Sequence, residues 1–455
     1  MVPFEGRNVM LDSVTVVVLA AGKGTRMKSP RPKVLHRLAG RSMIHHVLAV
    51  AAELEPTRAV VVLAPDMADV ADEVDRGPQP ATIVLQEPQL GTGHALLVAR
   101  DRLPASGEVL VLYGDTPLLT PTTLRSLLEA RRAAAAAVAV LGMNPPDPGG
   151  YGRFAFEGGE LAAIVEERHA DDGLKRDGLC NAGIMAFDAA RLGTLLDALE
   201  LRTPKNEYYL TDAVEHARAR GWSCTAIEMP WLEAIGINSQ AQLAEAEAVL
   251  QDRLRQAAMA GGVTLIGPDT VFLAADTRLE EGVEVGPYVV FGPGVRVAQA
   301  ARILPFCHLE GVAIGPGAQI GPFARFRPQS EIGAGAKIGN FVEVKNAKLE
   351  AGAKANHLSY IGDTRIGAKA NIGAGTITCN YDGFGKHWTE IGAGAFIGSN
   401  TALIAPVTIG EGAVIGAGST IDRDVPPGSL SIARGRQTDI PDGAARLRAR
   451  RLSKT

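Results

Sequence analysis

The residues best placed for chemistry near the N-terminus form a glycine-rich turn with basic side chains. The turn runs from Gly22 to Arg26, directly after a β-branched run that ends at Ala21, and Lys33 follows it. Such a turn after a parallel strand presents backbone N–H groups to phosphates, and lysine and arginine add positive charge. It is not a Walker loop, and Met27 stands where a dinucleotide-binding fingerprint needs its third glycine. A phosphate site of another class is therefore predicted, rather than a purely structural turn.

A second group of chemically capable residues surrounds His357 and Asn380. His357 lies in the segment Asn356 to Tyr360, beside an amide and an aromatic side chain, and Asn380 opens a polar segment that ends at Trp388. An imidazole, with an ordinary pKa of ~6.5, suits the removal of a proton from an amine. A lone histidine is usually an ordinary surface residue, but this one has the neighbours of a general base.

The scaffold of the second group is a six-residue repeat. From about Leu279 to Ile421 an aliphatic residue, often followed by Gly, returns every six residues with few exceptions. This period is typical of a hexapeptide β-helix, in which the aliphatic residue points inward and a small residue turns the corner. The fold is the usual platform of a class of acyltransferases. Arg327 and Lys345, one coil apart on the same side, favour an anion site over unrelated surface charges.

The scaffold of the first group is an alternation of β-branched runs and helical stretches. It predicts a Rossmann-like α/β domain with a mostly parallel sheet and ligands at the carboxyl ends of the strands. The expected strands are 16–21, 59–65, 82–86, 109–115 and 135–141, with helices such as 42–54 and 121–131. A helix from Ser239 to Ala260, ended by Gly261-Gly262, connects the two halves. We therefore expect an α/β domain over 1–238, a helical linker over 239–262, a left-handed parallel β-helix over 263–437 and a basic tail over 438–455.

Composition argues against several classes of protein. The 455 residues carry a net charge of −4, which argues against a nucleic-acid binder. No apolar run reaches the ~20 residues that a membrane helix needs, so no membrane segment is expected. The four cysteines lie far apart without metal or redox spacing, which predicts a reduced, cytoplasmic compartment.

Several motifs in a fixed order make the chain similar to a known family. The stretch Leu19 to Met27, followed by Pro32-Lys33-Val34, resembles the signature of sugar-1-phosphate nucleotidyltransferases. With Gln89 to His94, Tyr113-Gly114-Asp115 and the hexapeptide half, the chain resembles the bifunctional N-acetylglucosamine-1-phosphate uridylyltransferase/glucosamine-1-phosphate N-acetyltransferase family of bacterial cell-envelope synthesis. The similarity runs from about Val14 to Arg434. It implies acetyl-CoA-dependent acetylation of glucosamine-1-phosphate, then uridylyl transfer from UTP to N-acetylglucosamine-1-phosphate with release of pyrophosphate.

The resemblance assigns the first site to uridylyl transfer. Positioning and charge neutralisation carry this reaction, because a phosphate oxygen is already a nucleophile. Asp115 and Asn238 become the ligands of Mg²⁺, and Arg26 and Lys33 become catalytic cations, although a lone Asp at a strand end more often caps a turn. The nucleotide-sugar site is implied at Leu19, Ala20, Ala21, Gly22, Lys23, Lys33, Gln86, Gly91, Thr92, Tyr113, Gly114, Asp115, Gly152, Glu166, Asn181 and Asn238. The chain departs from the family at Arg168-His169 and at Asn206, which leaves details of sugar contact open.

The resemblance assigns the second site to acetyl transfer. His357 becomes the general base, and Asn380 orients the amine or steadies the tetrahedral intermediate. Glucosamine-1-phosphate is implied at Arg327, Lys345, Tyr360, Asn371 and Tyr381. Acetyl-CoA is implied at Ala374, Asn380, Tyr381, Lys386, Ser399, Ala417 and Arg434. Members of the family assemble as homotrimers with this site between neighbours, so a homotrimer is expected, although the repeat by itself indicates only a surface to bury.

Two other functions are compatible with parts of the sequence. A nucleotidyltransferase with one activity would use its β-helix only as a scaffold or regulatory element, and a sugar-nucleotide binder would catalyse nothing. His357, Asn380 and Lys386 argue against the first, because a scaffold needs no base or amide beside its loop. Asp115 with Asn238 argues against the second, because a binder need not hold a metal at the α-phosphate.

Overall fold

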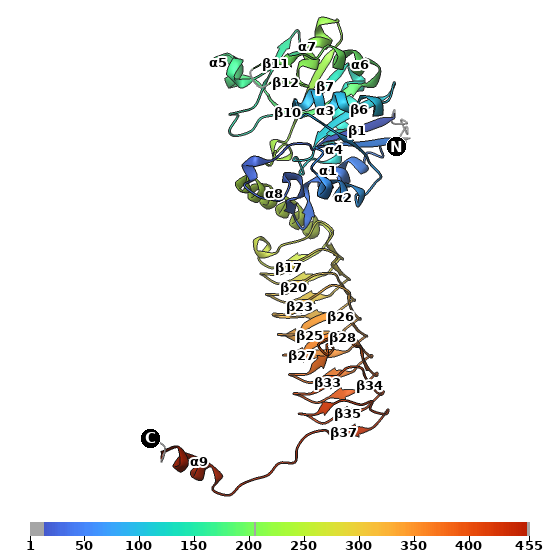
Figure 1. The fold of residues 1–455 in the computed structure, drawn as a ribbon, viewed down its shortest axis with the longest axis vertical. Coiled ribbons are helices and arrows are strands. Elements are labelled where there is room, and N and C mark those ends of the chain that lie inside the picture. The colour runs from blue at the N-terminus through green and yellow to red at the C-terminus, as the bar shows by residue number, and fades with distance from the viewer. Residues whose placement is uncertain (1–12, 204–205, 453–455) are drawn as a thin grey trace, which may run out of the picture. The chain divides into compact units, whose positions relative to one another are not determined.

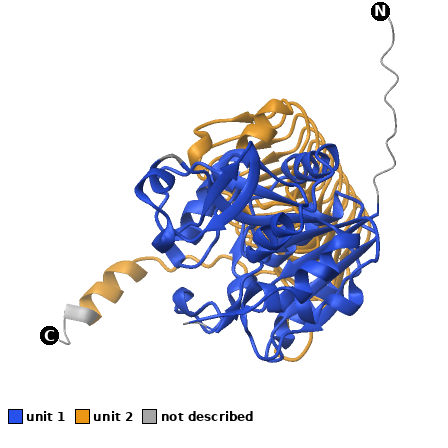
Figure 2. Ribbon diagram, turned by 90° about the horizontal axis from the view of Figure 1, so that it is seen from above, with its two compact units in different colours: residues 1–253 blue, residues 254–455 orange. Residues whose placement is uncertain are grey.

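The computed structural model describes residues 13–203 and 206–452, which form two compact units divided between residues 253 and 254 (Figures 1 and 2). The predicted outer limits of the first domain and of the tail, residues 1 and 455, lie outside the described residues. The division falls inside helix α8 (Gln240–Ala260), so the predicted connector contributes to both units. Ser239 caps this helix as expected, because its hydroxyl accepts a hydrogen bond from Gln242 N at 3.3 Å.

The first unit is organised by a sheet with the strand order β13-β7-β10-β6-β1-β4-β5. Its strands are β1 (Val14–Leu19), β4 (Arg58–Leu63), β5 (Thr82–Leu85), β6 (Glu108–Tyr113), β7 (Val138–Met143), β10 (Cys180–Asp188) and β13 (Cys224–Met229). Strand β1 is parallel to both β4 and β6, and β4 is parallel to β5. The carboxyl ends of these strands therefore meet at one edge, where ligands of such sheets bind.

Strand β10 departs from simple strand–helix alternation. It is antiparallel to both β6 and β7, between which it lies. A parallel strand there would need a crossover helix after β7. Instead the chain forms the hairpin β8 (Arg153–Glu157) and β9 (Glu160–Val165), the turn η4 (Glu167–His169) and the short helix α5 (Asp172–Asp177). The sheet is mostly parallel, as predicted, with one reversed strand in its middle.

Several helices of the first unit begin at side-chain caps. Ser42 caps α1 (Met43–Ala52) through His45 N, and Thr120 caps α4 (Pro121–Ala133) through Thr123 N, with Pro121 in the first turn. The other helices and short strands are η1 (Thr25–Met27), η2 (Lys33–Leu35), β2 (Arg37–Leu38), β3 (Arg41–Ser42), α2 (Ala68–Asp75), α3 (Gly91–Val98), η3 (Arg100–Arg102), α6 (Ala189–Asp197), β11 (Leu201–Arg202), β12 (Glu207–Tyr208), α7 (Asp212–Ala219) and η5 (Trp231–Glu233).

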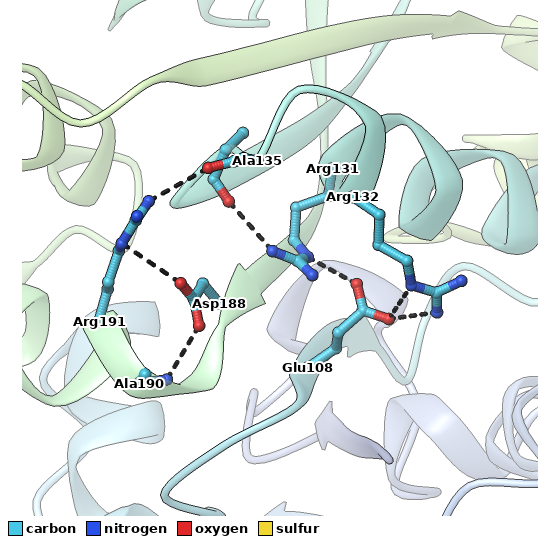
Figure 3. Close-up of polar contacts among 8 residues, drawn as sticks. Glu108, Arg131, Arg132, Ala135, Asp188, Ala190 and Arg191 are labelled. Carbon is cyan, nitrogen blue, oxygen red and sulfur yellow. Dashed lines mark hydrogen bonds and ion pairs between the residues drawn. The ribbon is translucent and has the colours of Figure 1, made fainter. Parts of the chain in front are cut away.

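A buried ion network joins α4 to the start of β6, away from the carboxyl edge of the sheet (Figure 3). The Glu108 carboxylate is fully buried and accepts hydrogen bonds from Arg131 Nε at 2.6 Å and Arg132 Nε at 2.8 Å. Arg131 also donates to the carbonyl of Ala136 at 3.2 Å. Each oxygen of the carboxylate therefore has a charged partner, which is the condition for burying a charge at tolerable cost.

The second unit is a left-handed parallel β-helix whose strands stack coil upon coil (Figure 1). Val285 pairs in register with Ile303, 18 residues later, and Ile303 pairs with Ile320. Three six-residue sides complete one coil, so the aliphatic positions of the repeat form a continuous buried column. The first face carries β14 (Thr264–Leu265), β16 (Glu284–Val285), β19 (Arg302–Ile303), β22 (Gln319–Ile320), β25 (Lys337–Asn340), β27 (Lys354–His357), β29 (Asn371–Ile372), β32 (Phe396–Ile397), β35 (Val414–Ile415) and β37 (Leu430–Ser431).

The other two faces belong to one sheet, because two long strands run through the corner between them. These strands are β26 (Glu343–Leu349) and β28 (Tyr360–Ile366). The second face also carries β17 (Val290–Phe291), β20 (His308–Leu309), β23 (Arg325–Phe326), β30 (Ile377–Cys379), β33 (Ala402–Ile404) and β36 (Thr420–Ile421). The third face carries β15 (Arg278–Leu279), β18 (Arg296–Val297), β21 (Val312–Ile314), β24 (Ser330–Ile332), β31 (Thr389–Ile391) and β34 (Val407–Ile409). The solenoid thus begins before Leu279 and ends after Ile421, so it is longer than the segment in which the six-residue repeat is clear.

Large side chains replace the expected small residues at the corner between the first and second faces. Tyr288, Phe306, Phe323 and Phe341 all have positive φ there, and their rings stack with centroids 4.8–5.2 Å apart. A left-handed backbone costs a non-glycine residue roughly 1–2 kcal/mol, and an aromatic pair returns about 0.5–1.5 kcal/mol. Stacking on the next coil therefore offsets much of the strain, and the rings remain about half exposed. We call these four residues the aromatic ladder.

The C-terminal segment forms α9 (Gly443–Leu452). Between α8 and β15 lies the short turn η6 (Pro268–Thr270). Among the residues that the structure describes, none of the helices has the length and apolar character that crossing a membrane requires.

Candidate active sites

The glycine-rich turn of the first unit brings Lys33 close to the end of β1. Gly24 has φ +62°, and a Cβ added to it would lie 2.5 Å from Lys33 Cβ, so only glycine fits this contact. The turn continues into η1 and then into η2, which starts at Lys33. The tight approach therefore holds the Lys33 side chain at the carboxyl edge of the sheet.

Lys33 lies among the residues predicted to hold a metal and phosphates. Its ammonium forms an ion pair with the Asp115 carboxylate and donates to Asn238 Oδ1 at 3.1 Å. Arg26 donates to the same oxygen at 2.9 Å. Ile237 N donates to the Asp115 carbonyl at 3.0 Å, which fixes the segment of Asn238 beside the end of β6. A carboxylate, an amide oxygen and two cations from distant parts of the chain thus converge.

A cavity of about 470 Å³ opens beside this cluster. The predicted site residues that line it are Leu19, Ala20, Ala21, Gly22, Lys23, Lys33, Gln86, Gly91, Thr92, Tyr113 and Asp115. Its lining also includes Val34, Gln89, Ala95, Glu207 and Tyr209, which the sequence analysis did not select. Two of these, Val34 and Gln89, stand in motifs already noted, and only the fold shows that they face the same space. The size suits part of a nucleotide sugar.

Hydrogen bonds hold the rim of the cavity in place. Gln86 Nε2 donates to the Gly91 carbonyl at 2.9 Å, and Gln89 Nε2 donates to the Ala21 carbonyl at 2.7 Å. Burial, together with the negative charge of Asp115, raises the pKa of Tyr113 to about 12, so its hydroxyl stays protonated at neutral pH. The rim therefore offers fixed amides and a neutral hydroxyl, as recognition of a base or sugar requires.

The residues predicted to hold the sugar lie outside the lining of this cavity: Asn181 is on β10, Gly152 directly precedes β8, and Glu166 directly follows β9. Asn181 N donates to the Gly152 carbonyl at 2.8 Å, and Asn181 Oδ1 accepts from Gly183 N at 2.9 Å. Glu166 is exposed and directly precedes η4, which contains Arg168 and His169. Gly114 and Asn238 are likewise outside the lining, although Asn238 contacts Lys33.

The family departure at Asn206 has a structural explanation. Asn206 has φ +54°, in the left-handed region. Glycine enters this region freely, and asparagine tolerates it better than most residues. The replacement therefore preserves the turn before Glu207, which lines the cavity.

In the solenoid, the structure gives His357 a partner that the sequence analysis missed. His357 Nδ1 lies 2.7 Å from Asn340 Oδ1, one coil earlier. With the amide oxygen as acceptor, Nδ1 carries the proton and Nε2 has the free lone pair. The 17-residue spacing between Asn340 and His357 was the available signal, because it matches one coil. The exposed imidazole is thus oriented as a base.

The predicted acetyl-CoA residues stack above His357 at the same corner. Gly375 N donates to the His357 carbonyl, Asn400 N to the Ala374 carbonyl, and Gly418 N to the Ser399 carbonyl. Arg434 completes the series, since its guanidinium donates to the carbonyl of Ala417. Residues separated by up to 77 positions in the sequence therefore form one continuous column. Asn371 lies on the first face, just before this corner.

Cations gather on the second face beside that column. Lys345 and Lys386 contact each other, and this contact lowers the pKa of Lys345, with smaller effects from burial and from the charges of Lys386 and Arg327. Arg327 forms an ion pair with Glu343 at 3.3 Å. Tyr360, also on this face, lies over Gly362. Such crowding of like charges is relieved by a bound anion, as expected of a phosphate site.

The long loop after β30 presents Lys386 to this face. Asp382 organises it by accepting hydrogen bonds from Phe384 N at 2.8 Å and Gly385 N at 2.7 Å. These bonds hold the pKa of Asp382 well below its usual value. His387 Nε2, which lies 2.7 Å from Asp382 Oδ2, lowers this pKa as well. Tyr381 pairs with Lys386 across the loop. The loop is therefore ordered by its own contacts.

Both halves of the chain match known families. Residues 16–177 match the MobA-like NTP transferase domain, and residues 311–346 and 389–423 match the bacterial transferase hexapeptide family of six repeats. Over 97% of its length the chain is 53% identical to the bifunctional protein GlmU of Paramagnetospirillum magneticum, covering 98% of that protein. It is 56% identical to GlmU of Azorhizobium caulinodans and 55% identical to GlmU of Xanthobacter autotrophicus, each over 96% of this chain and 98% of the relative.

The chain belongs to the GlmU family. This confirms the predicted family, the bifunctional transferase activity, and the fold of an NTP transferase domain followed by hexapeptide repeats. The alternatives of a single-activity enzyme with a scaffolding solenoid and of a sugar-nucleotide binder do not agree with full-length similarity to bifunctional GlmU proteins.

Proposed function

We propose that the two activities of this GlmU-family enzyme are divided between its two units. The first unit transfers UMP from UTP to N-acetylglucosamine-1-phosphate, and the solenoid acetylates glucosamine-1-phosphate with acetyl-CoA. The observation that carries this division is the presence of a separate polar cluster on each unit: Lys33 with Asp115 and Asn238, and His357 with Asn340. The first cluster has cations for phosphates, and the second has a base for an amine.

In the first unit, Lys33, Arg26 and Lys23 bind the phosphates, and the cavity beside them holds the base and sugar. The oxygen of the sugar phosphate attacks the α-phosphorus while the bond to pyrophosphate breaks, so no proton needs to be removed. Lys33 and Arg26 stabilise the negative charge that moves to the leaving pyrophosphate. Gln86 and the rim around Gly91 orient the nucleotide.

The donor set of the first unit also fits Mg²⁺. Asp115 and Asn238 offer one carboxylate and one amide oxygen, which both contact the Lys33 ammonium and therefore lie close together. Mg²⁺ commonly takes one or two protein oxygens and completes its shell with phosphates and water. When bound, it would neutralise phosphate charge. Among the described residues no group of three or more His, Cys, Asp or Glu side chains forms a metal site, in keeping with so few protein ligands.

In the solenoid, His357 Nε2 takes a proton from the acceptor ammonium. The amine nitrogen then attacks the acetyl carbonyl, the C–N bond forms and the C–S bond breaks. The nitrogen gives up its second proton, and the departing sulfur takes up a proton to leave as the thiol of CoA. Lys345, Arg327 and Lys386 hold the sugar phosphate. The column from Ala374 to Arg434 provides the surface for acetyl-CoA.

We also propose that the chain assembles as a homotrimer through the solenoid. The hexapeptide family match supports this, as does the aromatic ladder, whose rings are about half exposed. A contiguous exposed apolar strip of this kind is typical of a surface that another protein covers. The ladder continues into Leu358, next to His357, which supports a catalytic site beside the interface.

A paired assay tests the division of activities. Release of CoA from acetyl-CoA with glucosamine-1-phosphate measures the solenoid, and release of pyrophosphate from UTP with N-acetylglucosamine-1-phosphate and Mg²⁺ measures the first unit. His357→Ala should lower acetyl transfer by about 10²–10⁴-fold, and Asp115→Ala should lower uridylyl transfer by at least about 10²-fold. Each variant should leave the other reaction unchanged.

Matched controls are His308→Ala, an exposed histidine on the second face, and Asp101→Ala, an exposed aspartate of the first unit. Both should retain both activities. Loss of both reactions in His357→Ala, or of neither in Asp115→Ala, would contradict the assignment of these residues.

A further inference from the structure

A buried carboxylate, Asp363, lies beside the acetyl-transfer site without a role in the reaction as described. Its side chain is 5% exposed, and it sits in the middle of β28 at the corner between the second and third faces. Both Asp363 and Asn346, one coil earlier, have positive φ, of 46° and 45°. A buried charge at a strained backbone position raises the free energy of the folded state, so the contacts of Asp363 must offset this cost.

Both oxygens of the Asp363 carboxylate are occupied by amides. Oδ1 accepts from Asn346 Nδ2 at 2.6 Å, and Oδ2 accepts from Asn380 Nδ2. The three residues are spaced by 17 positions, so they form a column along the corner. Because an ionised carboxylate can only accept hydrogen bonds, the atom of Asn380 that faces it must be the nitrogen. Asp363 therefore decides which way the Asn380 amide points.

The consequence is a defined orientation of Asn380. Its side chain is 7% exposed, its backbone N donates to the Thr378 carbonyl at 2.9 Å, and its carbonyl accepts from His387 N at 2.8 Å. With the main chain fixed and Nδ2 bonded to Asp363, Oδ1 is directed away from that carboxylate. An amide oxygen accepts a hydrogen bond from an N–H group.

We propose that Asp363 is a positioning residue for acetyl transfer, which holds Asn380 so that its Oδ1 accepts a hydrogen bond from the acceptor amine. This rests on the proposed function of the solenoid. After His357 removes a proton, the neutral amine has N–H bonds and one lone pair. A fixed acceptor for one N–H directs the lone pair toward the acetyl carbonyl, and the site favours amines over acceptors without an N–H. Of the two roles considered for Asn380, this geometry selects orientation of the amine.

The simpler explanation is that Asp363 only ties neighbouring coils together. A double-mutant cycle separates the two, because a residue that acts through Asn380 has no further effect once Asn380 is removed. The variants are Asp363→Asn, Asn380→Ala and the double variant, in the full-length chain. Asparagine tolerates the left-handed backbone, and it removes the charge that fixes the amide.

Asp363→Asn should lower kcat of acetyl transfer by about 10–100-fold, the usual effect of losing a partner that orients a functional group. The KM for glucosamine-1-phosphate should not rise, because the Asp363 carboxylate bonds to amides, and removing its negative charge leaves Lys345 no less attractive to a phosphate. Uridylyl transfer should stay at the wild-type rate. In the Asn380→Ala background, Asp363→Asn should reduce kcat by less than about twofold. The control Asn346→Ala leaves the bond to Asn380 intact and should stay near wild type.

Three results would overturn the positioning role: a fully active Asp363→Asn, losses that multiply in the double variant, or an Asn346→Ala as impaired as Asp363→Asn. Thermal unfolding of each variant shows whether the solenoid remains folded, and the cycle compares only variants that do. A wild-type chain that transfers no acetyl group would instead contradict the proposed function of the solenoid.

Discussion

Lys345 shows how a single residue can be classified by its surroundings. The sequence placed it one coil from Arg327, and the structure adds Lys386 from the long loop. The contact with Lys386 lowers the pKa of Lys345, so the ammonium is destabilised where it stands, while the charge of Asp363 acts in the opposite direction. Arg327 is paired with Glu343, and a phosphate bound beside Lys345 and Lys386 would supply these two cations with a further counter-charge.

The prediction at the residue scale concerns Lys345→Gln. Because a hydrogen bond to a charged group contributes about 1.5–3 kcal/mol, KM for glucosamine-1-phosphate should rise by roughly 10–100-fold. The matched control is Lys348→Gln on the same strand, where Lys348 pairs with Glu331 at 3.1 Å on the third face. Steady-state kinetics of CoA release measure this KM for both variants. An equal rise in KM in the two variants would refute a phosphate contact at Lys345.

At the scale of elements, the junction of α4 with β6 depends on charge rather than on apolar packing alone. Arg131 and Arg132 both reach Glu108 from the last turn of α4 (Figure 3). The position lies at the opposite end of β6 from Asp115, so this network has no direct contact with substrate. Its role is to fix the helix against the strand that leads to Asp115.

Glu108→Gln should therefore destabilise the first unit without touching its site. Removing one partner of a buried pair leaves uncompensated charge and typically costs about 3–5 kcal/mol. The free energy of unfolding measured in denaturant, together with loss of uridylyl transfer at lower temperature, reports the effect. Asp197→Asn is the control, because its pair with Arg100 is exposed and should contribute little. A Glu108→Gln chain as stable as wild type would show that packing, not the ion network, holds α4.

At the scale of the whole molecule, the aromatic ladder is the feature that a single chain leaves unexplained. Its four rings stack on one another along the corner, yet they present one apolar edge to solvent. In the proposed homotrimer this edge is covered by a neighbouring copy. Because Leu358 extends the strip to His357, assembly and acetyl transfer should depend on each other.

Phe323→Glu should accordingly dissociate the trimer and lower acetyl transfer while sparing uridylyl transfer. The charge would be tolerated on an exposed corner but not in a buried contact. Light scattering after gel filtration gives the mass, and the paired assay gives both rates. The control is Phe156→Glu, an equally exposed phenylalanine of the first unit. A variant that remains trimeric with full acetyl transfer would place the interface elsewhere.

Much of this protein follows from local pattern. The six-residue period determines the solenoid because each aliphatic residue must point inward once per side, so its register can be counted along the chain. The turn before Arg26 and the strand end at Asp115 predict a phosphate site, because their geometry depends on a few adjacent residues. The reversed strand β10 could not be predicted in this way, since pairing between strands depends on distant segments.

The sequence by itself thus determined the family and the two scaffolds, and it proposed His357 and Asp115 as reactive groups, because these depend on residue type and short-range spacing. Only the tertiary structure decided which residues contact the candidate site residues. Asn340 contacts the His357 imidazole, Asp363 contacts the Asn380 amide, and Lys33 contacts Asn238. A hydrogen bond needs its two atoms about 3 Å apart, and that distance is set by how remote coils and strands pack, not by their spacing in the sequence.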